Sequence, residues 1–192
     1  MADPRAAVLD AVFGGAIAAH QRVRRLDPAP VLAAVDAILG AIARNGTVLV
    51  CGNGGSAADA QHFAAELVCR YARDRRPLRA VALSTDTSVL TAAGNDYGFD
   101  RVFARQVEAH GRAGDVLVAI STSGQSPNVL AAVDAARALR MRTIALTGRD
   151  GGELGARADV HVNVPEQETA RAQEVHITLL HAMCELIERE LQ

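Results

Sequence analysis

A histidine and a glutamate that follow a glycine-rich turn are the residues of this chain best suited to chemistry. His62 and Glu66 are four positions apart, so on a helix they share one face. An imidazole and a carboxylate can exchange protons near neutral pH. Just before them, Gly52, Gly54 and Gly55 allow a tight turn with exposed backbone N–H groups. Such a turn at the start of a helix attracts anions, which points to an enzyme for a phosphorylated substrate.

The elements around this turn are also predicted. Residues 48–51 are apolar and indicate a buried strand. Ser56 is expected to cap the helix that follows, with Asp59 three residues on as a partial capping box.

The same glycines match a dinucleotide-binding pattern by letter, G-x-G-x-x-A over 52–57. That pattern needs an acidic residue about 20 positions further on, at the end of the next strand. The best candidate, Asp86, stands 34 positions after Gly52. We therefore expect no nucleotide cofactor.

A second polar segment, Ser121-Thr-Ser-Gly-Gln-Ser126, lies between an apolar strand and Pro127. Serine followed by proline at the first helical position is typical of a helix start. A cap accounts for Ser126 alone, whereas the segment carries three further hydroxyls. Hydroxyl and backbone N–H donors can hold a phosphate without a basic residue. The segment therefore predicts a sugar-phosphate site.

The last helix carries three further candidates, Gln173, His176 and His181. At about 100° per residue the two histidines point about 140° apart, so one site does not readily use both. We expect His181 to belong to the site and His176 to be a bystander.

These segments belong to an alternation of strands and helices. Strands are expected at 47–51, 79–83, 116–120, 143–146 and 160–164. Helices are expected at 5–26, 31–43, 57–72, 86–93, 100–110, 127–140 and 169–191, with a turn at 94–98 and a short helix after 152. This order predicts an α/β fold in three layers, with a central parallel sheet of about five strands and helices on both faces. Ligands bind such sheets at the carboxyl ends of the strands.

The two N-terminal helices stand outside this pattern, so we expect residues 1–45 to pack on a partner subunit and residues 46–192 to form the catalytic part of one structural domain. The 192 residues are 49% hydrophobic but 3% aromatic, with a net charge of −2, which disfavours nucleic acid as a partner. The three cysteines are expected to be buried thiols. Residues 6–19 are apolar, but Asp10 interrupts them and no membrane span is evident, so a cytoplasmic protein is expected.

Several separated motifs together resemble the SIS (sugar isomerase) domain, and specifically the sedoheptulose 7-phosphate isomerases, also called phosphoheptose isomerases. The resemblance covers nearly the whole chain. The motifs that carry it are CGNGGSAADAQHFAAEL (51–67), GNDYGF (94–99), STSGQS (121–126), LTGRDGG (146–152) and ETARAQEVH (168–176) followed by His181.

The resemblance implies a flavodoxin-like SIS fold and a homotetramer with active sites between subunits, the N-terminal helices helping to form its central bundle. The implied reaction converts sedoheptulose 7-phosphate to D-glycero-D-manno-heptose 7-phosphate, the first step toward nucleotide-activated heptose. Glu66 and His181 would be the acid/base pair, meeting across a subunit boundary. The substrate contacts that it implies are Asn53, Gly54, Gly55, Ser56, Glu66, Asn95, Asp96, Ser121, Thr122, Ser123, Ser126 and Gln173.

Some members of this family bind zinc through residues that match His62, Glu66, Gln173 and His181. Two imidazoles and two oxygens form a reasonable set of zinc ligands. A residue that ligates the metal cannot also act freely as a base. We therefore expect one zinc ion per subunit that is not essential to the proton transfer.

The chain departs from part of the family at Ala170, where some members have an acidic residue, and Thr169 is a substitute hydroxyl there. The main alternative function is a non-catalytic SIS regulator that binds a replication initiator, which lacks the acid/base pair. Because Glu66 and His181 are both present, an enzyme is favoured. A sugar-phosphate-sensing transcription regulator would need a DNA-binding domain, for which the short N-terminal region and the net charge offer no support.

Overall fold

The computed structural model describes residues 3–191, and its centre is a five-stranded sheet. The strands lie in the order β2-β1-β3-β4-β5, and every neighbouring pair is parallel. They span Val48–Gly52 (β1), Ala80–Ala82 (β2), Val116–Ser121 (β3), Arg142–Gly148 (β4) and Val160–Val164 (β5). The helices span Pro4–Val23 (α1), Ala29–Ala43 (α2), Gly55–Val68 (α3), Thr87–Tyr97 (α4), Ala104–His110 (α5), Pro127–Ala138 (α6), Gly152–Arg157 (α7) and Thr169–Glu190 (α8).

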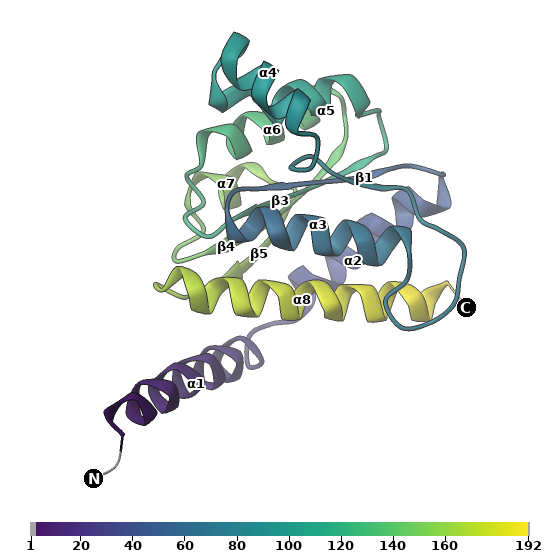
Figure 1. Ribbon diagram of the computed structural model, residues 1–192. Coiled ribbons are helices and arrows are strands. Elements are labelled where there is room, and N and C mark those ends of the chain that lie inside the picture. The colour runs from purple at the N-terminus through teal and green to yellow at the C-terminus, as the bar shows by residue number, and fades with distance from the viewer. Residues whose placement is uncertain (1–2, 192) are drawn as a thin grey trace.

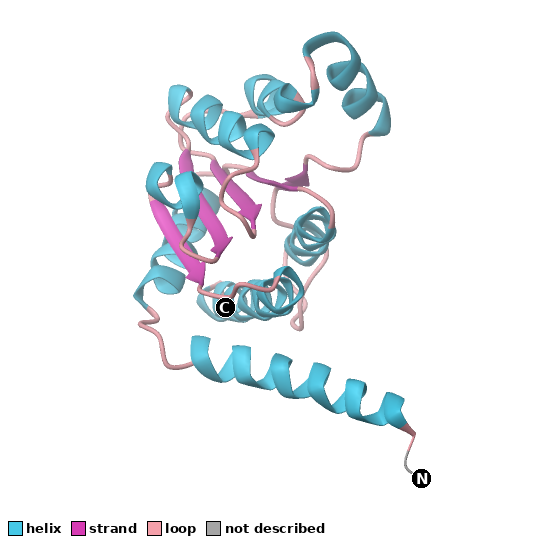
Figure 2. Ribbon diagram, turned by 90° about the vertical axis from the view of Figure 1, so that its left-hand side faces the viewer, coloured by secondary structure: helices cyan, strands magenta, loops and turns pink. Residues whose placement is uncertain are grey.

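Alternate residues of each strand face opposite layers of helices, as the two-residue period of a strand requires. Val48 and Val50 pack with α2, α3 and α8, whereas Leu49 and Cys51 pack with the layer of α4, α5, α6 and α7. Figure 2 shows the sheet between these layers, with α1 extending away from them. The predicted three-layer α/β fold is confirmed.

The segment before α5 differs from expectation. The predicted turn at 94–98 is wrong, because α4 continues to Tyr97 and ends at Gly98, whose φ is 83°. Asp86 caps this helix by accepting a hydrogen bond from the N–H of Val89. The helix expected at 100–110 is divided into a 3-10 turn at Phe99–Arg101 and α5. Glycine adopts a left-handed φ without strain, so the helix can end at Gly98. Gly94 keeps a helical conformation inside α4.

The cysteines are free thiols, but only two of them are buried. Cys51 and Cys184 lie in the core, and burial raises the pKa of each thiol to about 12. Cys69 is exposed, so the expectation that it is buried is wrong. It follows the last residue of α3, where the chain leaves the core for a surface loop. Over residues 3–191, no helix combines the length and the apolar character needed to cross a membrane.

Candidate active site

The start of α3 is organised by a glycine and not by a serine. Gly54 is the N-cap, with φ 55°, and no side chain caps the helix. Ser56 lies inside the first turn and is 3% exposed, so its predicted capping role is wrong. The left-handed φ of Gly54 starts the helix earlier than the sequence indicates. The first N–H groups of α3 are therefore left for another acceptor.

The serine-rich segment after β3 forms a compact group of hydroxyls. Ser121 Oγ lies 3.0 Å from Ser126 Oγ and 3.3 Å from Ser123 Oγ. Ser126 is the N-cap of α6, yet its hydroxyl makes no capping bond. Gly124, with φ 65°, brings this loop against the carbonyl of Gly151. The hydroxyls thus face one another rather than the helix end.

The two loops form one pocket of about 280 Å³, because β1 and β3 are neighbours and both end at this edge. Three helices, α3, α6 and α8, begin beside it. Helix N-termini favour negative charge, and three of them can hold a phosphate without a basic side chain. The pocket is lined by Asn53, Gly54, Gly55, Ser56, Ile120, Ser121, Thr122, Ser123, Ser126, Thr169 and Gln173.

The acid/base candidates lie further along two of these helices, α3 and α8. His62 Nε2 is 3.0 Å from Glu66 Oε1, and His181 Nε2 is 3.2 Å from His62 Nε2. The potential ligand atoms of all three lie within 4.8 Å of one another. The structure therefore brings Glu66 and His181 together inside one chain, and the expectation that they meet across a subunit boundary is wrong.

This meeting depends on α3 and α8 running side by side in the same direction (Figure 1). His62 and His181 are 119 residues apart, and near the starts of the helices Gly55 faces Gln173 at a separation of 118. A nearly constant separation is what two parallel helices with the same rise produce. The sequence contains no local signal for this register.

His176 is a structural residue, as predicted. Its ring is fully buried, and its Nε2 lies 2.9 Å from the carbonyl oxygen of Thr147. Burial lowers its pKa, and the hydrogen bond to Thr147 opposes this effect. The ring links α8 to β4 and takes no part in the pocket.

Of the remaining predicted substrate contacts, Gln173 lies at the pocket, whereas Asn95 and Asp96 do not. Gln173 lies on α8 at the pocket, and a Cβ built on Gly55 would be 2.6 Å from its amide atoms. Asn95 and Asp96 are exposed on α4 and bond to each other, Nδ2 to Oδ1, at 2.8 Å. Neither residue lines the pocket of its own chain.

Known proteins support a family assignment. A family model described as the SIS domain matches residues 13–148. A phosphoheptose isomerase of Bordetella avium is 60% identical over 162 residues, which cover 83% of this chain and 82% of that protein. The chain belongs to the phosphoheptose isomerases of the SIS domain family.

Solved structures of this family agree with the fold. The phosphoheptose isomerase GmhA of Neisseria gonorrhoeae has a TM-score of 0.90 at 54% identity, covering 94% of this chain and 97% of that one. A phosphoheptose isomerase of Francisella tularensis has a TM-score of 0.93 at 38% identity, covering 97% and 100%. The SIS fold therefore extends over both the pocket and the His/Glu group.

Two residues near the site, Thr169 and Asp59, have a larger part in it than the sequence indicated. Thr169, the first residue of α8, lines the pocket, where the sequence predicted only a substitute hydroxyl. Asp59 was considered only for capping, but its Oδ2 is buried without a hydrogen-bond partner. Burial raises the pKa of its carboxyl to about 6, and nearby His62 lowers it in part. Only the helical spacing of Asp59 and His62, three residues, could have indicated this proximity.

We expect Asp59→Asn to raise the free energy of unfolding by about 1 kcal/mol at pH 8 and to give no gain at pH 4. Above pH 6 the folded chain holds an unfavourable buried charge, and this penalty disappears as pH falls below the ordinary value of 3.8. A shift of two pKa units corresponds to about 3 kcal/mol, which partial exposure reduces to about 1. Urea unfolding of EDTA-treated protein measures it, with exposed Asp36→Asn as control. A loss of stability at pH 8 would contradict this interpretation.

Proposed function

We propose that this chain is an aldose–ketose isomerase that converts sedoheptulose 7-phosphate to D-glycero-D-manno-heptose 7-phosphate, toward nucleotide-activated heptose. The observation that carries the proposal is the pairing of Glu66 and His181 on the two helices whose N-termini border the hydroxyl-lined pocket. The pocket would hold the phosphate, and the paired groups would reach the carbonyl end of the sugar.

The separation of these two regions suits a long sugar phosphate. Gln173 at the pocket and His181 are eight residues apart on α8, a rise of about 12 Å. From C1 of a heptose to the phosphorus there are eight single bonds, which span about 9 Å at the extension of a polypeptide backbone. Side chains from both regions shorten the remaining gap. A shorter sugar phosphate held in the same pocket would place its carbonyl further from His181.

The proposed reaction passes through an enediol. A proton is removed from C1 of the ketose while the C2 oxygen gains one, and the electron pair of the C1–H bond forms the C1–C2 double bond. A proton is then added to C2 and the C1 oxygen loses one, which leaves the aldose. Glu66 and His181 would exchange these protons, with the hydroxyl cluster and the N-terminus of α3 fixing the phosphate. Asn53 and Thr122 would bind the substrate beside that cluster.

The three donors near the reacting end fit zinc, because two imidazole nitrogens and a carboxylate oxygen are common zinc ligands. His62, Glu66 and His181 would hold the ion, with Gln173 as the fourth ligand that the family resemblance implies. Zinc would supply a positive charge that polarises a carbonyl group, whereas the proton exchange assigned to Glu66 and His181 needs these side chains free of the ion.

We expect protein purified without a His-tag to contain zinc and to gain thermal stability when zinc is added. Binding to the folded state alone adds about 2.7 kcal/mol at a zinc concentration of 100 times Kd. Metal analysis and thermal unfolding measure this, and His62→Ala should remove the gain. Less than about a tenth of an equivalent per chain, with no thermal shift, would contradict a zinc site.

We also propose a homotetramer in which residues 1–45 form the central bundle and residues 46–192 the isomerase domain. Val8, Leu9 and Phe13 on α1 are large apolar residues that are 61–66% exposed. Neighbouring exposed apolar side chains of this kind mark a surface that packs against another protein chain. A neighbouring subunit would supply Asn95 and Asp96, which do not line the pocket of their own chain. Light scattering of the full chain measures the oligomeric state. A cytoplasmic location stays a prediction.

One assay tests the proposed function. Purified protein is incubated with sedoheptulose 7-phosphate, and the aldoheptose product is followed, with fructose 6-phosphate and ribulose 5-phosphate as comparisons. We expect kcat/KM for the heptose to exceed the others by at least about tenfold, since a shorter chain loses contacts at one end. Absence of turnover with all three would favour the non-catalytic regulator instead.

A further inference from the structure

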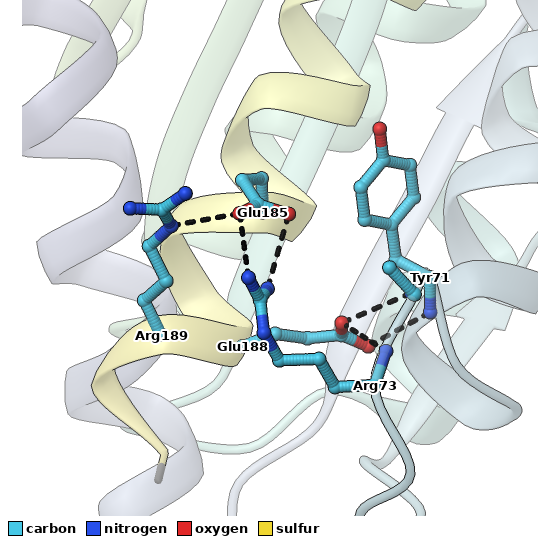
Figure 3. Close-up of polar contacts among 6 residues, drawn as sticks. Tyr71, Arg73, Glu185, Glu188 and Arg189 are labelled. Atoms are coloured by element: carbon cyan, nitrogen blue, oxygen red, sulfur yellow. Dashed lines mark hydrogen bonds and ion pairs between the residues drawn. The ribbon is translucent and has the colours of Figure 1, made fainter.

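The loop between α3 and β2, residues 69–79, is held by one buried carboxylate of α8. Glu188 is 2% exposed, and its two oxygens accept hydrogen bonds from three successive backbone N–H groups. The distances are 2.8 Å from Tyr71, 3.0 Å from Ala72 and 2.8 Å from Arg73. Figure 3 shows Glu188 pointing from α8 into the bend of the loop. Glu188 thus holds the bend at residues 71–73 of a loop that has no secondary structure of its own.

Arg75 connects this carboxylate to the end of α3. Its Nε lies 3.3 Å from Glu188 Oε1, and both side chains are almost fully buried. Its guanidinium also donates to the carbonyl oxygens of Glu66, at 2.7 Å, and Leu67, at 2.9 Å. These are terminal carbonyls of a helix, which lack partners within the helix. Arg75 therefore ties the turn that carries Glu66 to Glu188 on α8.

The charge of Glu188 is compensated despite its burial. Burial raises the pKa of its carboxyl, but the N–H groups of Tyr71, Arg73 and Ala72 and the guanidinium of Arg75 lower it more, so the pKa lies below the ordinary value. A carboxylate that accepts several backbone hydrogen bonds stays ionised near neutral pH. Removing it would leave three backbone donors without their acceptor and the buried Arg75 guanidinium without its ion-pair partner.

The loop places an aromatic ring against the proposed acid/base pair. The Tyr71 ring centroid is 5.4 Å from that of His181, with the planes tilted by 34°. The His62 ring is 4.9 Å from His181 at 65°. The phenol of Tyr71 makes no hydrogen bond with the residues that the structure describes, so the ring and not the hydroxyl makes the contact. His181 is therefore in contact with both rings, and only that of Tyr71 depends on the loop.

We propose that Glu188 is a positioning residue for the isomerase reaction, acting through the loop and Tyr71 on His181 and through Arg75 on the turn of Glu66. This proposal rests on the proposed function. A role confined to stability would require only that the loop be attached, whereas the geometry attaches it where it touches both members of the acid/base pair. Displacements of about 1 Å in such a pair can cost about 100-fold in rate.

The test compares four single variants and one double variant of the full chain. Glu188→Gln removes one of the two acceptor oxygens, and Tyr71→Ala removes the ring. Tyr71→Phe keeps the ring. Glu185→Gln is the matched control, because Glu185 binds the same loop through the Arg73 side chain at 2.9 Å and 3.1 Å but accepts no backbone N–H from it. The double variant combines Glu188→Gln with Tyr71→Ala.

We expect Glu188→Gln and Tyr71→Ala each to lower kcat by about 10- to 100-fold with KM changed less than about 3-fold. The double variant should lose clearly less than the product of the two single losses, since both substitutions act on the contact between Tyr71 and His181. Tyr71→Phe and Glu185→Gln should stay within about 3-fold of wild type. Unchanged kcat in Glu188→Gln with a lower Tm would overturn the proposal, as would multiplying effects in the double variant or a Phe variant as poor as the Ala variant.

A measurement without substrate separates this proposal from the proposed function. The Cε1–H signal of His181 in NMR spectra should shift when the neighbouring ring is lost or moved. Glu188→Gln and Tyr71→Ala should shift it, and Glu185→Gln should not. If wild type lacks isomerase activity, the proposed function fails while this shift still decides the positioning contact. If Glu188→Gln does not fold, Glu188→Asp, which keeps the charge but withdraws the acceptors, takes its place, and an unmoved signal overturns the proposal.

Discussion

Glu66→Gln should lower kcat for sedoheptulose 7-phosphate by about 10²- to 10⁴-fold, the range that a general acid or base contributes. Glutamine keeps the size of the side chain and an oxygen that can face His62, but it cannot take up a proton at neutral pH. Glu66 is partly exposed and has His62, 3.0 Å away, as its side-chain partner. The free energy of unfolding of EDTA-treated protein should therefore change little. Steady-state kinetics, circular dichroism and light scattering measure these quantities.

The matched control is Glu153→Gln, because Glu153 also forms an i,i+4 pair on a helix, with Arg157, outside the pocket. Exposed pairs of this kind contribute about 0.3–0.5 kcal/mol to the free energy of unfolding. Because Glu153 lies outside the pocket, its replacement should leave activity unchanged. If folded Glu66→Gln protein of native oligomeric state turned over at nearly the wild-type rate, Glu66 would not be part of the acid/base pair.

Gly55→Ala should lower kcat/KM by about 100-fold with little effect on stability. The added Cβ would lie 2.6 Å from Nε2 and Oε1 of Gln173, which must move out of the pocket. The φ of Gly55 is outside the left-handed range, and alanine suits a helix better than glycine, so the backbone tolerates the change. The end of a flexible side chain can move at small cost, whereas substrate positioning is sensitive to about 1 Å.

Kinetics and thermal unfolding of Gly55→Ala should thus disagree, with activity lost and Tm kept. Gly40→Ala in α2 is the control, since its Cβ would meet only the Arg44 guanidinium, at 3.6 Å or beyond. It should leave both quantities unchanged or raise Tm slightly. A Gly55→Ala protein with wild-type kcat/KM would show that Gln173 is not needed at the pocket.

Much of the fold could be predicted because its signals are local. Apolar runs and the turns between them indicated all five strands, and Pro127 after Ser126 marked the start of α6. The positions of single residues within turns were less certain, since several residues can serve the same role. Ser56 and Gly54 both suit a helix start, and Gly94 and Gly98 both suit a helix end. In each case the structure uses the glycine with positive φ.

The chemical groups of the site could also be named from the sequence. The turn of Gly52–Gly55, the hydroxyls of 121–126 and the pair of His62 with Glu66 are local, because each depends on neighbours within one or two turns. The spacing of i and i+4 places His62 beside Glu66 in any helix, and their side chains are 3.0 Å apart in this one. No single one of these segments indicates that the others lie beside it in one site.

Only the tertiary structure decided how the segments meet. The parallel packing of α3 and α8 brings His181 to His62 from 119 residues away and sets Gln173 against Gly55. It also lets Glu188 hold the loop that carries Tyr71. Such contacts depend on which helix faces pack together and in what register, and the free energy of that packing is spread over many buried side chains. By itself the sequence determined the chemical groups and the elements that carry them, and the packing of the whole chain decided that Glu66 and His181 meet within one subunit.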